Sequence, residues 1–277
     1  MTLGISDSPL GQQTQYISTY APELLFPIPR QQARQSLSLD SASLPFYGVD
    51  IWTGYELSWL DERGKPVVAV AEFEIPFDSP SIVESKSFKL YLNSLNQTRF
   101  ANIEQVKNTL VNDLSLAVGA PVSVKMESLP ARYLLTAVTE LDGVCIDDLP
   151  VEVEHYHPAP ELLTADAGQV VDEKLVSHLL KSNCPVTGQP DWASVQVCYS
   201  GAKIDRDALL RYIISFREHQ DFHEHCVERM FVDILTRCEP RVLSVYARYT
   251  RRGGLDINPF RSTDIHALPP EVRLVRQ

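Results

Sequence analysis

The chain has 277 residues, of which 44% are hydrophobic and 22% are charged, with a formal net charge of −11. This composition is typical of a soluble protein that forms one large or two modest domains. The negative charge argues against long contacts with a nucleic-acid backbone, and no run reaches the roughly 18 apolar residues of a membrane helix. The N-terminus lacks the basic start and apolar run of a secretory signal. We therefore expect a cytoplasmic protein whose partners are neither nucleic acid nor membrane.

The cysteines number five, and no two of them form a Cys-x-x-Cys pair. In a reducing compartment an odd set of unpaired cysteines is expected to remain as free thiols. This pattern argues against a structural zinc site and leaves a catalytic thiol as an alternative. The residues are Cys145, Cys184, Cys198, Cys226 and Cys238.

The first half of the chain opens with residues 1–47, whose Gln, Ser and Pro content predicts an irregular N-terminal arm. Apolar and polar residues then alternate over 51–59 and again over 67–75. A period of two residues is typical of a strand with one buried face. The turn residues Arg63-Gly64 lie between the two segments, so a long β-hairpin is predicted.

Two amphipathic helices are predicted next. Apolar residues at helical spacing mark the first over 88–95. Asn102 and Gln105 have the spacing of a capping box at the start of the second, and Gly119 is expected to end it. A strand is predicted over 122–126.

The second half repeats this order. Asp205 is expected to cap a helix with apolar residues over 209–216, followed by another over 227–235 and a strand over 242–250. Each of the eight apolar residues on the first pair of helices has an apolar counterpart 121 positions later, as in Phe88/Leu209 and Val106/Val227. We interpret this spacing as an internal duplication.

The predicted order of strands and helices favours an α+β fold, in which antiparallel sheets carry paired helices on one face. We expect a first module over 48–128, a connection over 129–164 that contains four prolines, and a second module over 165–277. The Gly-x-Gly-x-x-Gly motif of a dinucleotide-binding βαβ unit does not occur in the sequence.

Glu84 immediately precedes the first predicted helix. A carboxylate at a helix N-terminus is stabilised by the helix dipole, so the residues alone favour a structural role. The alternative is a carboxylate that binds the N–H edge of a purine-like ring. Lys86 and Lys89 are most simply explained as solvated surface charges.

Cys184 lies in a polar segment with two prolines and a glycine, whereas the other buried cysteines are expected within strands or helices. A thiol needs a basic or hydrogen-bonding neighbour to react as a nucleophile. A nucleophile and an incidental exposed thiol remain equally open for Cys184. Asp191, seven residues later, is either a functional acid or a turn residue.

His223, Glu224, His225 and Cys226 begin the second helix of the second half. His223 is aligned with the apolar stripe, where a histidine is usually a satisfied core residue. Neighbouring helical positions differ in direction by about 100°, so His223, His225 and Cys226 are not expected to share a zinc ion.

Arg251 and Arg252 precede two glycines after the last predicted strand. A turn is the simplest interpretation. Paired arginines beside flexible glycines are also suited to binding a cofactor phosphate.

Four segments together resemble the NADPH-dependent 7-cyano-7-deazaguanine reductases, the nitrile reductases of queuosine biosynthesis. They occur in the family's order, and the resemblance extends from about Phe46 to Arg261. The segments are Glu84–Asn93, Ser182–Trp192, Phe222–Glu224 and Tyr249–Pro259.

The resemblance implies tandem tunnelling-fold modules, the long form of the family, in which the helix signature and the cysteine lie in different halves. It also implies that Cys184 attacks the nitrile carbon to give a covalent thioimide while Asp191 donates a proton. Two NADPH molecules then complete the reduction to the aminomethyl product, and no metal is required for the chemistry.

The same resemblance implies which residues bind the two small molecules. The deazapurine is expected to contact Val83, Glu84, Ser85, His223 and Glu224, and NADPH is expected to contact Ser85, Lys86, Arg252 and Gly253. Modules of this fold usually close their sheets by oligomerising, so a homodimer is expected by analogy.

Two other functions remain to be distinguished. A cyclohydrolase-like enzyme of the same fold would hold stoichiometric zinc and consume no NADPH. A purine-binding module without catalysis would tolerate Cys184→Ala without loss of function.

Overall fold

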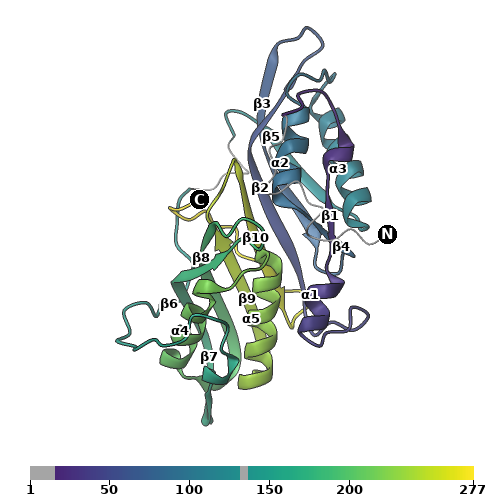
Figure 1. The fold of residues 1–277 in the computed structure, drawn as a ribbon. Helices are drawn as coiled ribbons and strands as arrows, with labels where there is room; N and C mark the ends of the chain where they lie inside the picture. The colour runs from purple at the N-terminus through teal and green to yellow at the C-terminus, as the bar shows by residue number, and fades with distance from the viewer. Residues whose placement is uncertain (1–15, 132–136) are drawn as a thin grey trace. The chain divides into compact units, whose positions relative to one another are not determined.

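The computed structural model describes residues 16–131 and 137–277, and the chain divides into two units (Figure 1). Unit 1 comprises residues 1–33, 50–136 and 251–256, and unit 2 comprises residues 34–49, 137–250 and 257–277. Two long strands, β2 and β10, contribute residues to both.

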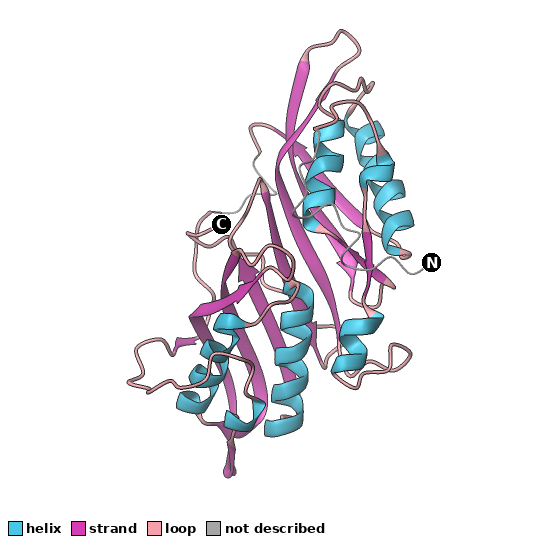
Figure 2. Ribbon diagram, viewed as in Figure 1, coloured by secondary structure: helices cyan, strands magenta, loops and turns pink. Residues whose placement is uncertain are grey.

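Unit 1 contains three neighbouring strands in the order β5 (Ser123–Ser128), β3 (Pro66–Pro76) and β2 (Tyr47–Leu60). Strands β3 and β5 are antiparallel. Helices α2 (Ser85–Ser94) and α3 (Ile103–Val118) lie on the same side of these strands (Figure 2). A separate antiparallel pair joins β1 (Pro27–Pro29) to β4 (Ser81–Val83).

Unit 2 has the strand order β10-β9-β8-β7-β6. Its strands are β10 (Leu255–Ser262), β9 (Val242–Tyr249), β8 (Pro190–Ile204), β7 (Ala165–Asn183) and β6 (Val144–Cys145). All of these pairs are antiparallel except β6 with β7. Its helices, again on one side of the strands, are α4 (Arg206–Ser215), the 3-10 helix η4 (Phe216–Glu218) and α5 (His223–Cys238).

The α+β class and the tandem modules predicted from the sequence are confirmed. Asn102 and Asp205 cap their helices as predicted, by accepting hydrogen bonds from Gln105 N and Ala208 N respectively. The capping box differs in detail, because the Gln105 side chain accepts from Ala101 N and not from Asn102 N. Gly119 ends α3 in the left-handed conformation.

The spacing of 121 residues holds only for the first helix of each pair. Helices α2 and α4 begin 121 residues apart, at Ser85 and Arg206, whereas α3 and α5 begin 120 apart, at Ile103 and His223. The segment between the helices is one residue shorter in unit 2. The structural counterpart of Val106 is therefore Cys226, and the prediction that paired it with Val227 is wrong for this helix.

A second repeat extends into the predicted arm and connection. The sequence Ala-Pro-Glu-Leu-Leu occurs at 21–25 and at 159–163, and it forms the 3-10 helices η2 (Pro22–Leu24) and η3 (Pro160–Leu162). The Ala21 amide donates to Ser94 Oγ and the Ala159 amide donates to Ser215 Oγ, each over 3.2 Å. The stretch 16–47 also contains β1 and helix α1 (Gln31–Ser36), so it is more ordered than the irregular arm we expected.

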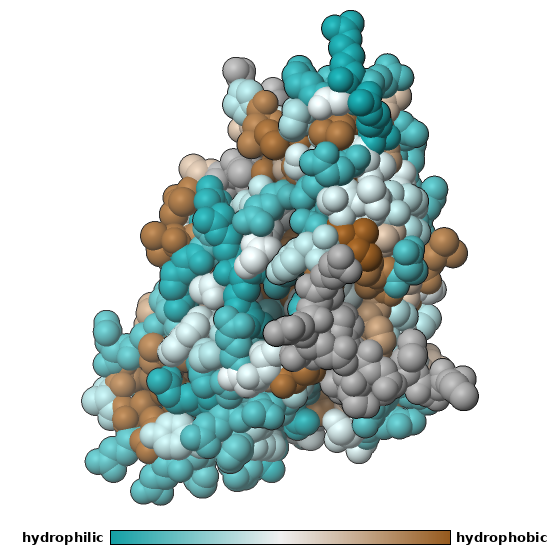
Figure 3. Space-filling model, turned by 45° about the horizontal axis from the view of Figure 1, so that its top comes forward, coloured by the Kyte–Doolittle hydropathy of each residue, from teal (hydrophilic) through white to brown (hydrophobic). Residues whose placement is uncertain are grey.

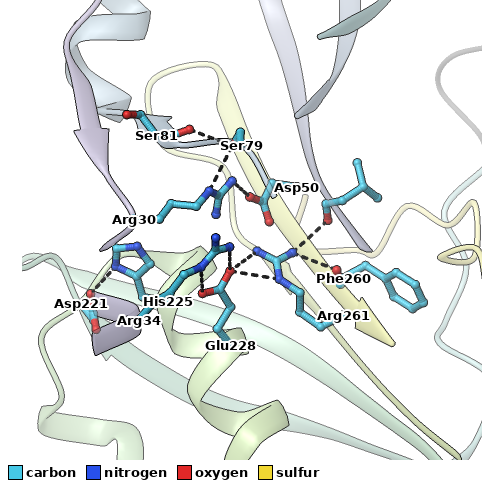
Figure 4. A network of polar contacts seen from close by, with 11 residues as sticks. Arg30, Arg34, Asp50, Ser79, Ser81, Asp221, His225, Glu228, Phe260 and Arg261 are labelled. Carbon is cyan, nitrogen blue, oxygen red and sulfur yellow. Dashed lines mark hydrogen bonds and ion pairs between the residues drawn. The ribbon is translucent and has the colours of Figure 1, made fainter. Parts of the chain in front are cut away.

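Fully buried arginine–carboxylate pairs occur in both units (Figure 4). In unit 1, Arg30 contacts Asp50 over 2.5 Å. In unit 2, the Glu228 carboxylate on α5 lies between Arg34, at 2.8 Å, and Arg261, at 2.9 Å. A buried charge is tolerated only where such partners compensate for lost hydration.

The surface in Figure 3 is largely hydrophilic, with apolar residues in scattered groups. Among the described residues, no helix is both long and apolar enough to span a membrane.

Candidate active site

Glu84 links β4 to α2 in unit 1, and its side chain is fully buried. Its carboxylate caps the helix by accepting hydrogen bonds from Lys86 N at 2.7 Å and Ser87 N at 2.8 Å. Burial raises the pKa of Glu84, although the two amides and the charges of Lys89 and Lys86 oppose this shift. An ionised carboxylate has about four acceptor positions, so the capping role still leaves capacity for a ligand N–H.

The residues beside Glu84 differ in exposure. Val83 ends β4 and is buried, opposite Pro27 of β1. Ser85 and Lys86, the first two residues of α2, are half-buried. Because Glu84 occupies the amides of Lys86 and Ser87, an anion here depends on side-chain charge and not on those two amides.

The turn between β9 and β10 belongs to unit 1. Gly253 and Gly254 have φ values of 56° and 75°, the left-handed conformation that glycine adopts without strain. A side chain added at Gly253 would meet the Lys89 side chain of α2 at 3.2 Å, so the turn lies against that side chain. The neighbouring Arg251 guanidinium lies over the Tyr55 ring, 5.0 Å from its centroid. The fold therefore brings the predicted cofactor residue Gly253, next to Arg252, against the Lys89 side chain of α2, the helix in whose first turn Lys86 lies.

Cys184 is the first residue of the loop between β7 and β8 in unit 2. Its amide donates to Gln189 O over 2.9 Å, and its carbonyl accepts from Gly188 N over 3.0 Å, so the loop is closed at its base. The side chain is buried, with 5% of its surface exposed. The alternative of an incidental exposed thiol is therefore wrong.

Asp191 lies at the same end of the β7–β8 hairpin as Cys184. It is the second residue of β8 and pairs with Ser182 across the ladder, two residues before Cys184. Asp191 is buried, which does not fit the alternative of a simple turn residue.

His223, the first residue of α5, contacts this acid: its Nε2 lies 3.3 Å from Asp191 Oδ1. The imidazole is stacked on Tyr249 of β9, with a centroid distance of 3.8 Å and an interplanar angle of 6°. The other ring nitrogen, Nδ1, is buried and has no hydrogen-bond partner among the described residues. Such an atom is uncommon in a folded protein and is suited to meeting a ligand.

The residues that follow His223 point in different directions. Glu224 is buried with 2% of its surface exposed. His225 turns away and contacts Asp221 over 3.0 Å, while Cys226 is buried beside Ser182 and Tyr249. The expectation that His223, His225 and Cys226 do not converge on one ion agrees with these contacts. Cys226 is fully buried in the core, and this burial raises its pKa.

Tyr249 and Ser182 lie beside the predicted residues but received no role in the sequence analysis. Tyr249 is opposite Ala193 in the β8–β9 ladder, which places it on the face that carries Asp191. The alternation of Val245, Ala247 and Tyr249 could have indicated this face, but nothing local connects Tyr249 to His223. The site residues thus form two groups, one in each unit.

Comparison with known proteins identifies the family. Residues 16–126 match the family described as nitrile reductase, 7-cyano-7-deazaguanine-reductase N-term, and residues 190–267 match the QueF-like protein family. The NADPH-dependent 7-cyano-7-deazaguanine reductase of Bordetella parapertussis is 60% identical over 275 residues, covering 99% of this chain and 100% of the relative. The chain belongs to this family.

Relatives from other bacteria carry the same name. The Dechloromonas aromatica protein is 58% identical, covering 98% of this chain and 95% of its own length. The Chromobacterium violaceum protein is 57% identical, covering 98% of this chain and 96% of its own length. A solved structure of an archaeosine synthase QueF-Like in the apo form covers 36% of this chain and 96% of its own, at 19% identity and a TM-score of 0.30. That likeness is too partial to carry an argument.

Proposed function

We propose that this chain reduces the nitrile of 7-cyano-7-deazaguanine to an aminomethyl group with NADPH, as a step of queuosine biosynthesis. The observation that carries the proposal is that a buried loop thiol and a buried acid lie at one end of the β7–β8 hairpin in unit 2, and that a stacked histidine contacts the acid. Relatives named for this reaction match the chain over nearly its full length.

Cys184 is proposed as the nucleophile. The Cys184 S–H bond breaks and its proton passes to the Asp191 carboxylate, the sulfur bonds the nitrile carbon, one π bond of the C≡N group breaks, and a proton is added to the nitrogen, which gives a thioimide. Asp191 is proposed to supply this proton, and its contact with His223 offers a route for exchanging it. A buried position keeps water away from the thioimide, which water would otherwise hydrolyse.

The reduction to the amine needs two hydrides and two protons. NADPH supplies the hydrides when bound, one molecule for each of two steps. After the first step the C–S bond breaks, so Cys184 leaves as the thiol and is regenerated. The protein's own contribution is to hold the carbon at Cys184 and to deliver protons from Asp191.

Recognition of the deazapurine is assigned to two carboxylates and a ring nitrogen. Glu84 and Glu224 are buried acceptors, suited to the N–H and amino groups of a guanine-like edge. His223 Nδ1 is a further buried polar atom that a ligand can satisfy. Val83 and Ser85 flank Glu84 and are proposed to contact the same ring.

The residues proposed for NADPH fit an anionic group. Lys86 and Lys89 on α2 and the Arg251-Arg252 pair carry the positive charge, and Gly253 lets the turn lie against Lys89 without a side chain between. Arginine can bind a phosphate through two parallel hydrogen bonds, which offsets the absence of a Rossmann glycine loop.

The central test is the intact mass of the protein mixed with the nitrile in the absence of NADPH. The wild-type chain should gain the mass of one substrate molecule. Cys184→Ala should gain nothing and still bind the base. Cys198→Ser, which removes a half-buried thiol of β8, is the matched control and should form the adduct. An adduct on Cys184→Ala, or none on the wild type with binding intact, would refute the proposed nucleophile.

Absorbance at the nicotinamide band separates the rival functions, because neither a cyclohydrolase nor a binding module consumes NADPH. We further propose a cytoplasmic homodimer. Light scattering on the purified chain tests the subunit number.

A further inference from the structure

A second group of reactive side chains lies in unit 2, outside the proposed active site. Cys145 of β6, Asp147 just after it and His178 of β7 each offer one ligand atom, and these atoms all lie within 4.8 Å of one another. Cys145 is exposed, whereas Asp147 and His178 are half-buried, so an ion could enter from solvent.

The backbone explains why these three meet. A turn closed by the Leu149 N to Ile146 O hydrogen bond follows β6, and it brings Asp147 into contact with the Cys145 thiol. Strand β6 pairs in parallel with β7, with Cys145 opposite Val176 and Ile146 N bonded to Val176 O. The ladder of β7 with β8 shifts register between Ser177 and Leu180, exactly where His178 lies. A bulge of this kind redirects a side chain.

Neighbouring groups hold the three ligands in place. The Asp147 carboxylate accepts from Ser177 Oγ over 2.6 Å and from His178 N over 2.9 Å. His178 Nδ1 lies 2.8 Å from Ser194 Oγ, which fixes the ring and leaves its other nitrogen for a ligand. Hydrogen bonds that orient the ligands in this way are a regular feature of metal sites.

We propose that Cys145, Asp147 and His178 form a Zn²⁺ site with water as the fourth ligand. Thiolate, imidazole and carboxylate are the zinc ligands of proteins, whereas Mg²⁺ and Ca²⁺ take oxygen only. Ligand atoms on a tetrahedral zinc lie roughly 3.5 Å apart, so contraction by about 1 Å closes the site. Binding releases the thiol proton of Cys145 to solvent.

The charges nearby are mixed. Asp148 acts on Cys145 and adds negative charge. Arg276 adds positive charge, but its guanidinium donates hydrogen bonds to three oxygen atoms, namely His178 O, Ala193 O and Ser194 Oγ. The ion would join the two-residue strand β6 to β7, which is a structural role and does not enter the reduction.

The test uses the full chain, freed of metal by dialysis and titrated with Zn²⁺ in a calorimeter. We expect about one ion per chain at this site, a higher melting temperature with zinc, and at least tenfold weaker binding in Cys145→Ser and in His178→Ala. Cys184→Ala and Cys198→Ser are the matched thiol controls and should bind zinc as the wild type does.

Substitution with Co²⁺ gives a second readout, since thiolate ligation produces a charge-transfer absorption that Cys145→Ser should lack. NADPH oxidation by Cys145→Ser should equal that of the wild type. A wild-type chain that binds no zinc, or Cys145→Ser and His178→Ala variants that bind it unchanged, would overturn the proposal.

Discussion

The two modules begin their first helices at equivalent positions with different chemistry. Glu84 before α2 and Asp205 before α4 are 121 residues apart, and the amide of each donates to an equivalent carbonyl, Phe26 O or Thr164 O. Asp205 is exposed and caps one amide, whereas Glu84 is fully buried and caps two. A small exposed acid is sufficient to start this helix, so the burial of a longer one needs another reason.

The second helices differ in the same way. The residues that α3 buries are all apolar, namely Val106, Leu110, Leu114 and Val118. Helix α5 buries Glu224, His225 and Glu228 as well as apolar residues. Helix α3 therefore buries no charged residue, whereas α5 buries two glutamates. Of these residues, Glu224 is the one that we propose to contact the substrate.

The largest effect is expected at Glu228, the buried carboxylate between Arg34 and Arg261. Glu228→Gln removes the charge that pairs with two buried guanidinium groups and should lower the free energy of unfolding by about 3–5 kcal/mol. Glu104→Gln, in the first turn of α3 and exposed, should change it by less than about 0.5 kcal/mol. Urea denaturation measures both. Equal effects would remove the distinction between the two helices.

Each unit has a hydrogen bond from a tyrosine on its first helix to an aspartate on its second helix, and the two bonds differ in their surroundings. Tyr91 donates to Asp113 over 2.5 Å in unit 1, and Tyr212 donates to Asp233 over 2.7 Å in unit 2. Asp113 also accepts from Tyr20. Tyr212→Phe should therefore cost about 1.5–3 kcal/mol in thermal unfolding, and Tyr91→Phe less, because Asp113 keeps a partner. The opposite order would contradict this reasoning.

The helix caps are compared directly through Glu84→Gln and Asp205→Asn. If Glu84 accepts a ring N–H, the loss of its charge should weaken nitrile binding roughly tenfold to a hundredfold, a cost of about 1–3 kcal/mol. Asp205→Asn should leave nitrile affinity unchanged. Calorimetry measures both affinities, and wild-type affinity in Glu84→Gln would return Glu84 to a purely structural role.

The two arginine-containing hairpin turns of unit 1 give a further comparison. Arg252→Ala should raise the NADPH Michaelis constant at least ~10-fold, equivalent to about 1.4 kcal/mol, while adduct formation with the nitrile persists. Arg63→Ala, in the β2–β3 turn beside Gly64, is the control and should leave the constant unchanged. An unaltered constant in Arg252→Ala would place the cofactor elsewhere.

The smallest expected effect is a pH dependence of stability. The pKa of Glu84 is raised in the folded chain. The stabilisation of the folded state that this shift gives is therefore fully present below about pH 4.5, and it is lost as the pH rises through the pKa of Glu84 in the folded chain. The melting temperature of the wild type minus that of Glu84→Gln should therefore decrease as the pH rises over that interval. Melting curves of both proteins check this, and a difference that rises with pH would show that the sign is wrong.

The sequence by itself determined the first hairpin, the two pairs of helices and the strand that follows each pair. Periodicity of two or 3.6 residues reports which face of a segment is apolar, and the caps Asn102 and Asp205 act on amides within three residues. Both signals are local, so the hairpin, the two pairs of helices and the duplication follow from the residues alone. The family resemblance, also a local match of segments, is confirmed by the relatives.

The tertiary structure alone decided which polar groups are buried and what they meet. Nothing near Glu84 in the sequence indicates that it is enclosed, and Asp191, His223 and Tyr249 come from β8, α5 and β9. Cys145, Asp147 and His178 show no metal-ligand spacing, because a parallel strand pair and a bulge bring them together. The single residue missing between α4 and α5 likewise became visible only when burial fixed the register. Such contacts depend on long-range pairing, which a pattern of neighbouring residues does not encode.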